Sequence, residues 1–218
     1  AWGMYGITTK MPDSHWMTEA RLKGTKTVAI TVEYSATANK CDDVVVIRPG
    51  TDPAFALGLA QVMMSEQRYD ADFVKRFTDL PTLVRMDTLE RLRAKDVFPA
   101  HQEKGLHNWT QVVPKGKTPP PTTQQNGVQI PEALAPEFAD FVMWDTASNR
   151  PVAVGHDDIG AHFAKVGIDP ALSGSFELTL ADGKKVTVRP VFDLVREYLN
   201  ANMTPELCSQ ITWAPKEA

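Results

Sequence analysis

Hydrophobic residues along the first 70 positions fall into continuous runs and helically spaced runs in turn. Thr27–Val32 is a continuous β-prone run bounded by charge, and Asp43–Ile47 repeats that pattern, as expected of parallel strands buried on both faces. Residues 35–40 form a short helical or irregular connection, and 54–66 carry Ala, Leu, Val and Met at helical spacing. This order predicts an α/β fold with a Rossmann-like parallel sheet layer and flanking helices.

Helical spacing also flanks this core pattern on both sides. Residues 13–24 predict a short amphipathic helix with Asp13 as its N-cap and Gly24 as its stop. A charged apolar stripe over 69–93, broken at Pro81, predicts one or two further helices. These elements belong to a first segment, residues 1–95.

The character of the chain changes after residue 95. Residues 96–140 include GKTPPPTTQQNG, which is rich in Pro, Thr and Gln and lacks periodicity, so they predict an irregular insertion. The last segment, 141–218, predicts strands at 141–144 and 150–154 and a β-hairpin turning at Asp182-Gly183. Helices are expected at 191–199 and after Pro205, with Thr204 as the N-cap of the second.

Composition and charge narrow the possible partners. The 218 residues are 43% hydrophobic and 23% charged, with a net charge of -4 and an isoelectric point near 5.7. A clustered basic excess is absent from the sequence, which argues against a nucleic-acid partner or an anionic membrane surface. The chain opens on Ala1-Trp2 and closes on a segment resembling the start of a helix, so we expect a piece of a longer polypeptide.

Acidic residues follow the two predicted parallel strands. Glu33 comes directly after the first strand, and the second strand leads to Pro49-Gly50-Thr51-Asp52. Ligands of such sheets sit outside the carboxyl ends of the strands. A carboxylate accepts both N–H groups of a guanine edge, while Gly50 permits close backbone approach and Thr51 adds a hydroxyl. Two alternatives stay open: Glu33 as a solvated strand-end charge, and Thr51 or Asp52 as a simple helix cap.

Other chemistry finds little support. The G-x-G-x-x-G turn of dinucleotide folds is missing from the sequence, and Trp2–Gly6 is only a loose substitute. The five histidines, 15, 101, 107, 156 and 162, lack metal-binding spacing, and His156-Asp157-Asp158 is interpreted as solvated. Cys41 and Cys208 are interpreted as structural thiols. Hydrolase motifs are also missing from the sequence.

The segment from Trp2-Gly3 through TKMPDSHWMTEARLKGTKTVAITVEYSATANKCDDVVVIRPGTD resembles molybdopterin oxidoreductases of the dimethyl-sulfoxide-reductase superfamily. The likeness is greatest to catalytic subunits of the nitrite oxidoreductase and respiratory nitrate reductase group. It covers residues 2–85 and resumes near Leu178.

The resemblance implies a molybdenum bis(molybdopterin guanine dinucleotide) cofactor, one guanine dinucleotide arm of which this segment would bind. Trp2 and Gly3 would line the pterin or diphosphate, with Asp13 and His15 anchoring their loop. Glu33 would meet the ribose or guanine, and Tyr34 and Ser35 would complete the turn. The guanine edge would be held by Gly50, Thr51 and Asp52. Met4 and Tyr5 stand where many relatives carry Asn, and Val32 replaces a common Pro.

The implied activity is oxygen-atom transfer, as nitrite oxidation to nitrate or nitrate reduction. Catalytic residues, the metal ligand and an iron–sulfur cluster would lie elsewhere in the full subunit. Expected partners are an iron–sulfur electron-transfer subunit and a membrane or haem subunit, at the periplasmic side of the bacterial cytoplasmic membrane. The alternatives are another substrate, such as selenate, chlorate or an organic donor, or a non-catalytic Rossmann-like guanine-nucleotide module.

Overall fold

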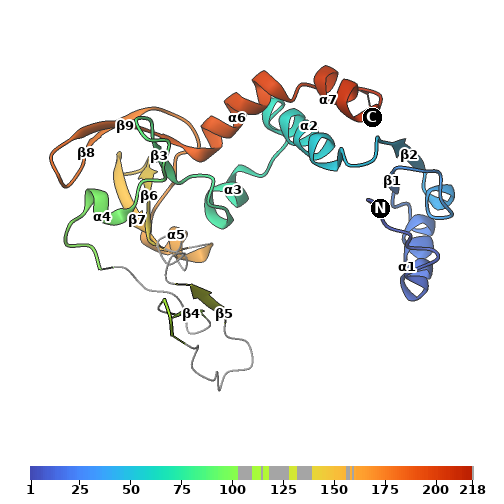
Figure 1. Ribbon diagram of the computed structural model, residues 1–218, viewed down its shortest axis with the longest axis horizontal. Coiled ribbons are helices and arrows are strands. Elements are labelled where there is room, and N and C mark those ends of the chain that lie inside the picture. The colour runs from blue at the N-terminus through green and yellow to red at the C-terminus, as the bar shows by residue number, and fades with distance from the viewer. Residues whose placement is uncertain are drawn as a thin grey trace. The chain divides into compact units, whose positions relative to one another are not determined.

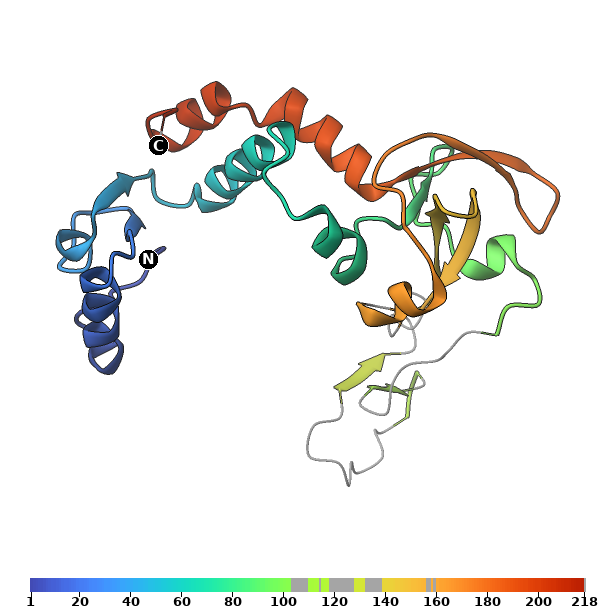
Figure 2. The same cartoon turned by 180° about the vertical axis from the view of Figure 1, so that it is seen from behind.

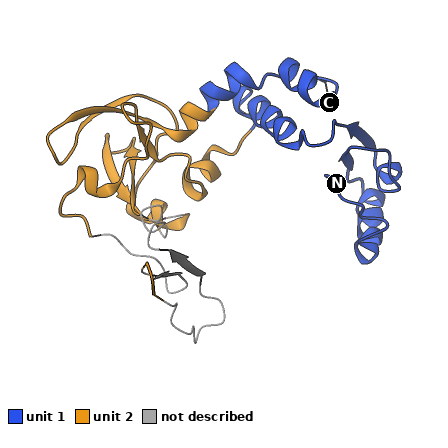
Figure 3. Cartoon of the chain, in the orientation of Figure 1, with its two compact units in different colours: residues 1–68, 196–218 blue, residues 69–195 orange. Residues whose placement is uncertain are grey.

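The computed structural model describes residues 1–102, 110–113, 115–117, 128–131, 139–155, 158 and 160–217 (Figure 1). Helices are mixed with several small sheets, so the predicted α/β class is confirmed. The chain packs as two compact units, residues 1–68 with 196–218 and residues 69–195, shown in different colours in Figure 3. The division into segments 1–95, 96–140 and 141–218 stays a prediction about domain organisation.

Unit 1 is built on two parallel strands, β1 and β2. Its elements are α1 (Met11–Leu22), β1 (Val28–Thr31), the 3-10 helix η1 (Ala38–Lys40), β2 (Asp43–Val46), α2 (Asp52–Ser65), the end of α6 (Val191–Asn202) and α7 (Pro205–Thr212). The strands pair in register from Val28 opposite Asp43 to Thr31 opposite Val46. Both strands are rich in β-branched residues, which suit a pleated ladder.

The amino-terminal residues extend this pair on the other edge of β1. Trp2 forms a parallel bridge with Ile30, whose N–H and C=O bond the Ala1 carbonyl at 2.8 Å and the Gly3 amide at 2.9 Å. Because a strand residue directs its N–H and C=O to one side, Ile30 faces the amino terminus while its neighbours face β2. The parallel arrangement therefore has three rows of backbone at this point.

Helix α2 follows β2 directly and packs against α7. Both views of the ribbon show α2 alongside α7 (Figures 1 and 2). Ile47, Phe55 and Ala214 form a small buried cluster between the strand end and the helices. Gln61, only 9% exposed, donates a 3.0 Å hydrogen bond to Asn200 of α6. These contacts fix the start of α2 beside the ends of the parallel strands.

Unit 2 is organised around antiparallel strands. Its elements are α3 (Ala71–Phe77), β3 (Leu83–Arg85), α4 (Ala94–Val97), β4 (Thr110–Val113), β5 (Val128–Pro131), β6 (Phe141–Asp145), β7 (Arg150–Val154), α5 (Ala161–Val166), β8 (Phe176–Thr179), β9 (Lys185–Pro190) and the start of α6. Strands β3, β9 and β8 form one antiparallel sheet and β6 and β7 another, while β4 and β5 pair in parallel.

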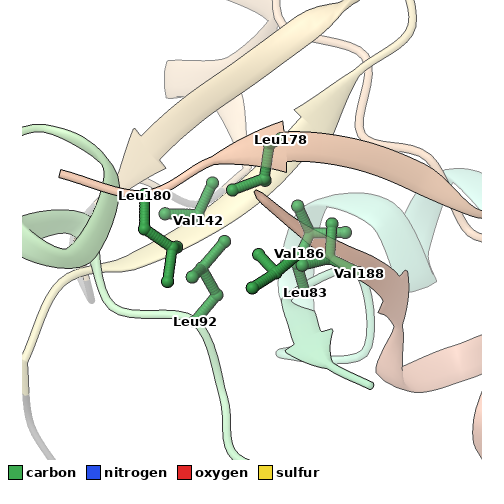
Figure 4. Close-up of a cluster of buried hydrophobic side chains, with 7 residues drawn as sticks. All are labelled: Leu83, Leu92, Val142, Leu178, Leu180, Val186 and Val188. Atoms are coloured by element: carbon green, nitrogen blue, oxygen red, sulfur yellow. The ribbon is translucent and has the colours of Figure 1, made fainter. Parts of the chain in front are cut away.

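The main core of unit 2 consists of aliphatic side chains from both antiparallel sheets (Figure 4). The buried members of this cluster are Leu83, Leu92, Val142, Leu178, Leu180, Val186 and Val188. The alternation in β9, where Val186, Val188 and Pro190 are buried and the residues between them are less so, supplies one face of that core. A smaller cluster of Met143, Val154 and Phe163 holds α5 against the β6–β7 hairpin.

Several predicted elements are confirmed. The two hairpins lie at β6–β7 and β8–β9, and Gly183 takes the left-handed conformation (φ +87°) that its turn requires. Thr204 caps α7 by accepting a hydrogen bond from the Leu207 amide. Helix α2 spans Asp52–Ser65, two residues earlier at its start than the helical spacing indicates.

Other predictions are wrong. Helix α1 begins at Met11, so Asp13 lies inside its first turn and does not cap it. Leu83–Arg85, expected to be helical, pairs with β9 because its buried leucine and valine complete that sheet. Within the expected irregular insertion, 96–140, the described residues include the paired strands β4 and β5, and the irregular character of the segment stays a prediction. The remainder of GKTPPPTTQQNG after residue 117, and His107, lie outside the described residues.

Candidate functional site

The candidate site lies at the carboxyl ends of β1 and β2. These parallel strands finish at the same edge, where Glu33 follows β1 and Asp52 opens α2 after β2. The amino-terminal loop reaches both acids: Trp2 donates a hydrogen bond to Asp52, and Tyr5 donates one to Glu33. Two acidic groups and two aromatic donors therefore share this edge of unit 1.

Trp2 connects the amino-terminal row to the start of α2. Its indole N–H donates to the Asp52 carboxylate at 2.7 Å (Nε1 to Oδ1). Its ring meets Phe55 edge-on, with the ring centroids 5.6 Å apart and the planes at 83°, a favourable aromatic geometry. Trp2 is 39% exposed, whereas Phe55 is 8% exposed. The family resemblance implies that Trp2 lines the pterin or diphosphate; its hydrogen bond to Asp52 was not predicted.

Tyr5 also belongs to the candidate site, although it was noted from the sequence only because many related proteins carry Asn there. Its hydroxyl donates a short hydrogen bond to Glu33. That hydrogen bond, then desolvation and the charge of Glu33, raise the pKa of Tyr5 above its ordinary value. Glu33 therefore has a hydrogen-bond partner but remains exposed, so the alternative of a solvated strand-end charge stays open. Aromatic residues in a loop facing a strand-end acid are the signal that could have indicated this pair.

The turn before α2 is arranged by its own backbone. Gly50 has φ +78°, and a Cβ placed there would meet nothing within 4 Å, so open space borders the turn. The Thr51 hydroxyl donates to the Arg48 carbonyl at 2.6 Å and makes no cap hydrogen bond to α2. Thr51 is nevertheless the N-cap residue of α2, so the alternative of Thr51 or Asp52 as a simple helix cap stays open. Asp52 sits in the first turn, where the helix dipole favours its negative charge.

The turn after β1 is held by short-range hydrogen bonds. The Ser35 hydroxyl accepts from the Ala38 amide at 3.3 Å, and Thr37, only 2% exposed, accepts from the Ile7 amide at 3.2 Å. Tyr34 is 67% exposed, and its hydroxyl lies 3.5 Å from the Asn39 side chain. Ser35 thus shapes the turn, while Tyr34 presents an aromatic face to solvent.

Asp13 and His15 lie on α1, and both are exposed. The His15 ring contacts its neighbour Trp16, with centroids 4.4 Å apart. Their expected role in anchoring the Trp2-Gly3 loop stays a prediction. The anchor that the structure provides for this loop is the backbone bridge of Trp2 to β1 and the contact of Ile7 with Thr37.

The chemistry of this edge fits a guanine nucleotide. The Asp52 carboxylate could accept the two adjacent N–H groups of a guanine, and the Glu33 carboxylate could accept ribose hydroxyls. Tyr34 has an exposed ring for stacking, and Gly50 leaves room for close approach. Among the predicted site residues, Trp2 and Asp52 are joined by a hydrogen bond, while Glu33 is joined to the same amino-terminal loop through Tyr5.

Groups elsewhere have structural partners. Within the described parts of the chain, His, Cys, Asp and Glu do not gather in threes as a metal site requires, and no helix has the length and hydrophobicity to cross a membrane. Asp158, expected to be solvated, is 5% exposed because it accepts the Gly155 amide and pairs with His162 at 3.0 Å. His156 and Asp157 lie outside the described residues. Burial raises the pKa of the Cys208 thiol, consistent with a structural role.

Comparison with known proteins places these observations in a family. No protein-family model matches the chain. Perchlorate reductase subunit alpha of Dechloromonas aromatica is 37% identical over 222 residues, covering 100% of this chain and 22% of that protein. Respiratory nitrate reductase subunit alpha of Haloferax mediterranei is 32% identical over 220 residues (100% and 19%). Chlorate reductase subunit alpha of Ideonella dechloratans is 32% identical over 206 residues (94% and 18%).

The chain thus has an α/β fold with acidic residues at the ends of its parallel strands, and its sequence is similar to these relatives along almost its whole length. The chain belongs to the molybdopterin oxidoreductases of the dimethyl-sulfoxide-reductase superfamily. Within that class it is homologous to part of the alpha subunits of perchlorate, nitrate and chlorate reductases. It spans about a fifth of the length of these relatives.

Proposed function

We propose that this chain is a segment of a molybdenum-dependent oxidoreductase and that it binds the guanine end of a molybdopterin guanine dinucleotide. The complete enzyme would interconvert nitrite and nitrate, with nitrite oxidation as its principal reaction. Homology to alpha subunits of oxyanion reductases supports the enzyme class. The arrangement of Asp52, Glu33 and the amino-terminal loop supports the cofactor role.

The observation that carries the proposal is the hydrogen-bonded carboxylate at the start of α2. Asp52 is partly buried, accepts the Trp2 indole N–H at 2.7 Å, and borders the open space beside Gly50. A carboxylate accepts two parallel N–H groups, the pattern that the guanine edge presents. Glu33, Tyr34 and the backbone near Gly50 would hold the ribose and approach the base.

The residues of this chain would bind and orient the cofactor, and they carry none of the chemical steps. The cofactor, when bound, would supply oxygen-atom transfer and two-electron chemistry. An iron–sulfur cluster elsewhere in the subunit, an iron–sulfur partner subunit and a membrane or haem subunit would carry the electrons. We place the complex at the periplasmic side of the cytoplasmic membrane, which protease accessibility in spheroplasts would test.

The cofactor role is tested by Asp52→Asn in the complete enzyme. Asparagine keeps one acceptor but directs an amino group at guanine. We therefore expect guanine nucleotide per mole of protein, released by acid hydrolysis, to fall at least about tenfold, because a charge-assisted contact of ~1.5–3 kcal/mol is lost. Asp43→Asn is the control, because Asp43 is exposed at the other end of β2 and pairs with Lys26 at 2.6 Å. Unchanged guanine content in Asp52→Asn would refute the proposal.

The reaction is tested by assaying the same enzyme with nitrite and an electron acceptor, and with nitrate, selenate and chlorate and an electron donor. We expect the highest kcat/KM with nitrite or nitrate. A higher value with another substrate would favour the alternative within the same superfamily. Tight guanine-nucleotide binding without pterin and without any of these activities would favour the non-catalytic module.

A further inference from the structure

We infer that Trp2 is a positioning residue that fixes the Asp52 carboxylate for a two-point contact with guanine, and so sets selectivity for guanine over hypoxanthine. This inference rests on the proposed contact between Asp52 and guanine. It assigns Trp2 a role different from the expected one of lining a pterin or diphosphate.

The backbone of Trp2 is fixed beside β1. The Ala1 carbonyl accepts the Ile30 amide at 2.8 Å, and the Gly3 amide donates to the Ile30 carbonyl at 2.9 Å, so hydrogen bonds flank Trp2 on both sides. Because the backbone on both sides of Trp2 is hydrogen-bonded to a strand, the direction of its side chain is better defined than it would be on an unpaired loop.

The indole ring is fixed as well. Phe55, on the first turns of α2, presents its ring edge-on at 5.6 Å, and Phe55 itself is buried with Ile47 and Ala214. An indole has a single N–H and cannot accept a hydrogen bond. Because that N–H donates to Asp52 Oδ1, it is not available for a phosphate or a pterin.

The orientation of Asp52 follows from this contact. Each carboxylate oxygen accepts more than one hydrogen bond, so Oδ1 and Oδ2 can both still receive an N–H from a ligand. A carboxylate held by the indole has less rotational freedom to lose on binding. Guanine offers the N1–H and the 2-amino group side by side, whereas hypoxanthine offers the N1–H alone. A fixed carboxylate therefore gains a second hydrogen bond only from guanine.

The experiment measures binding of GMP and IMP to the cofactor-free complete enzyme by titration calorimetry. Trp2→Phe retains an aromatic ring beside Phe55 and removes the N–H. We expect GMP affinity to fall about fivefold to tenfold and IMP affinity to change by less than twofold. Trp16→Phe is the matched control, since Trp16 lies on α1 and is 62% exposed. In the background of Asp52→Asn, the further effect of Trp2→Phe on GMP affinity should disappear.

Each outcome separates this inference from the proposed function. If Asp52→Asn weakens GMP binding and Trp2→Phe leaves the GMP-to-IMP ratio unchanged, Trp2 has no positioning role while the proposed function stands. If Trp2→Phe weakens GMP and IMP equally and lowers the melting temperature, its role is structural and the inference is overturned. If wild-type enzyme binds neither nucleotide, or Asp52→Asn changes neither affinity, the proposed guanine site itself fails.

Discussion

Asp42 is a single residue on which the attachment of α1 depends. Its carboxylate accepts the Arg21 guanidinium at 2.7 Å and 3.3 Å, the Thr27 amide at 2.7 Å and the Thr27 hydroxyl at 2.8 Å. These hydrogen bonds, first that of Arg21 and then those of Thr27, hold the pKa of Asp42 well below its usual range. Helix α1 contributes no buried residue. It is therefore attached to the strand pair by polar contacts and not by a buried hydrophobic face.

We predict that Asp42→Asn loosens α1 at neutral pH. Because the folded pKa is lowered, the stabilisation by Asp42 is complete above the unfolded value of about 4 and is lost as pH falls toward the folded value. In the wild-type chain, the NMR amide shifts of α1 should therefore move toward coil values as pH falls below about 4. The Asp42→Asn chain should show those shifts already at pH 7, with little further change on acidification.

Asp43→Asn serves as the control, because the Asp43–Lys26 ion pair is exposed and contributes little. A helix α1 whose amide shifts are the same in Asp42→Asn and wild type at pH 7 would contradict this role. Asp42 was not singled out from the sequence because its partners Arg21 and Thr27 become neighbours only when β1 and β2 pair.

The sequence pattern alone predicted those helices and strands for which burial and intrinsic propensity favour the same structure. β1, β2 and α2 were predictable because Val-rich runs and helically spaced Ala and Leu favour the structures that form. Leu83–Arg85 was not, because its strand depends on pairing with β9 over a hundred residues later. The same reason applies to the site: the acids at the strand ends were predictable, but the donors Trp2 and Tyr5 reach them through tertiary contacts.

Gly58 lies where α2 packs closely against α7. A Cβ at this position would lie 2.8 Å from Cys208 Sγ and 3.1 Å from Cys208 Cβ, both too close. Alanine favours a helix over glycine by up to ~1 kcal/mol, but overpacking a close helix contact costs about 1–3 kcal/mol. We predict that Gly58→Ala lowers the free energy of unfolding by about 1–2 kcal/mol in denaturant titrations of the full chain.

The same change in a Cys208→Ala background should cost less, since the nearest clashing atom is gone. Ser65→Ala, on the exposed side of α2, is the control and should leave stability within about 0.5 kcal/mol. Equal costs of Gly58→Ala in both backgrounds would show that the sulfur of Cys208 does not limit the approach of these helices.

Segments similar to this chain occur in proteins that are named for different reactions. Perchlorate reductase, nitrate reductase and chlorate reductase are named for different substrates, and the alpha subunit of each matches this chain. A shared segment among proteins with different named substrates is expected if its ligand is the part of the cofactor that they have in common. Substrate selection then belongs to other parts of the polypeptide.

This argument predicts the result of exchanging the segment. In this test, the segment in the complete enzyme is replaced by the corresponding segment of the Dechloromonas aromatica subunit, which is 37% identical. The ratio of kcat/KM for nitrate and perchlorate should stay within about threefold of the original, a change of less than ~1 kcal/mol. Guanine and molybdenum content, measured in parallel, establish that the chimera is loaded. A loaded chimera whose preference moves about tenfold or more toward perchlorate would place substrate-selecting residues inside this segment, and the cofactor-holding role alone would no longer account for it.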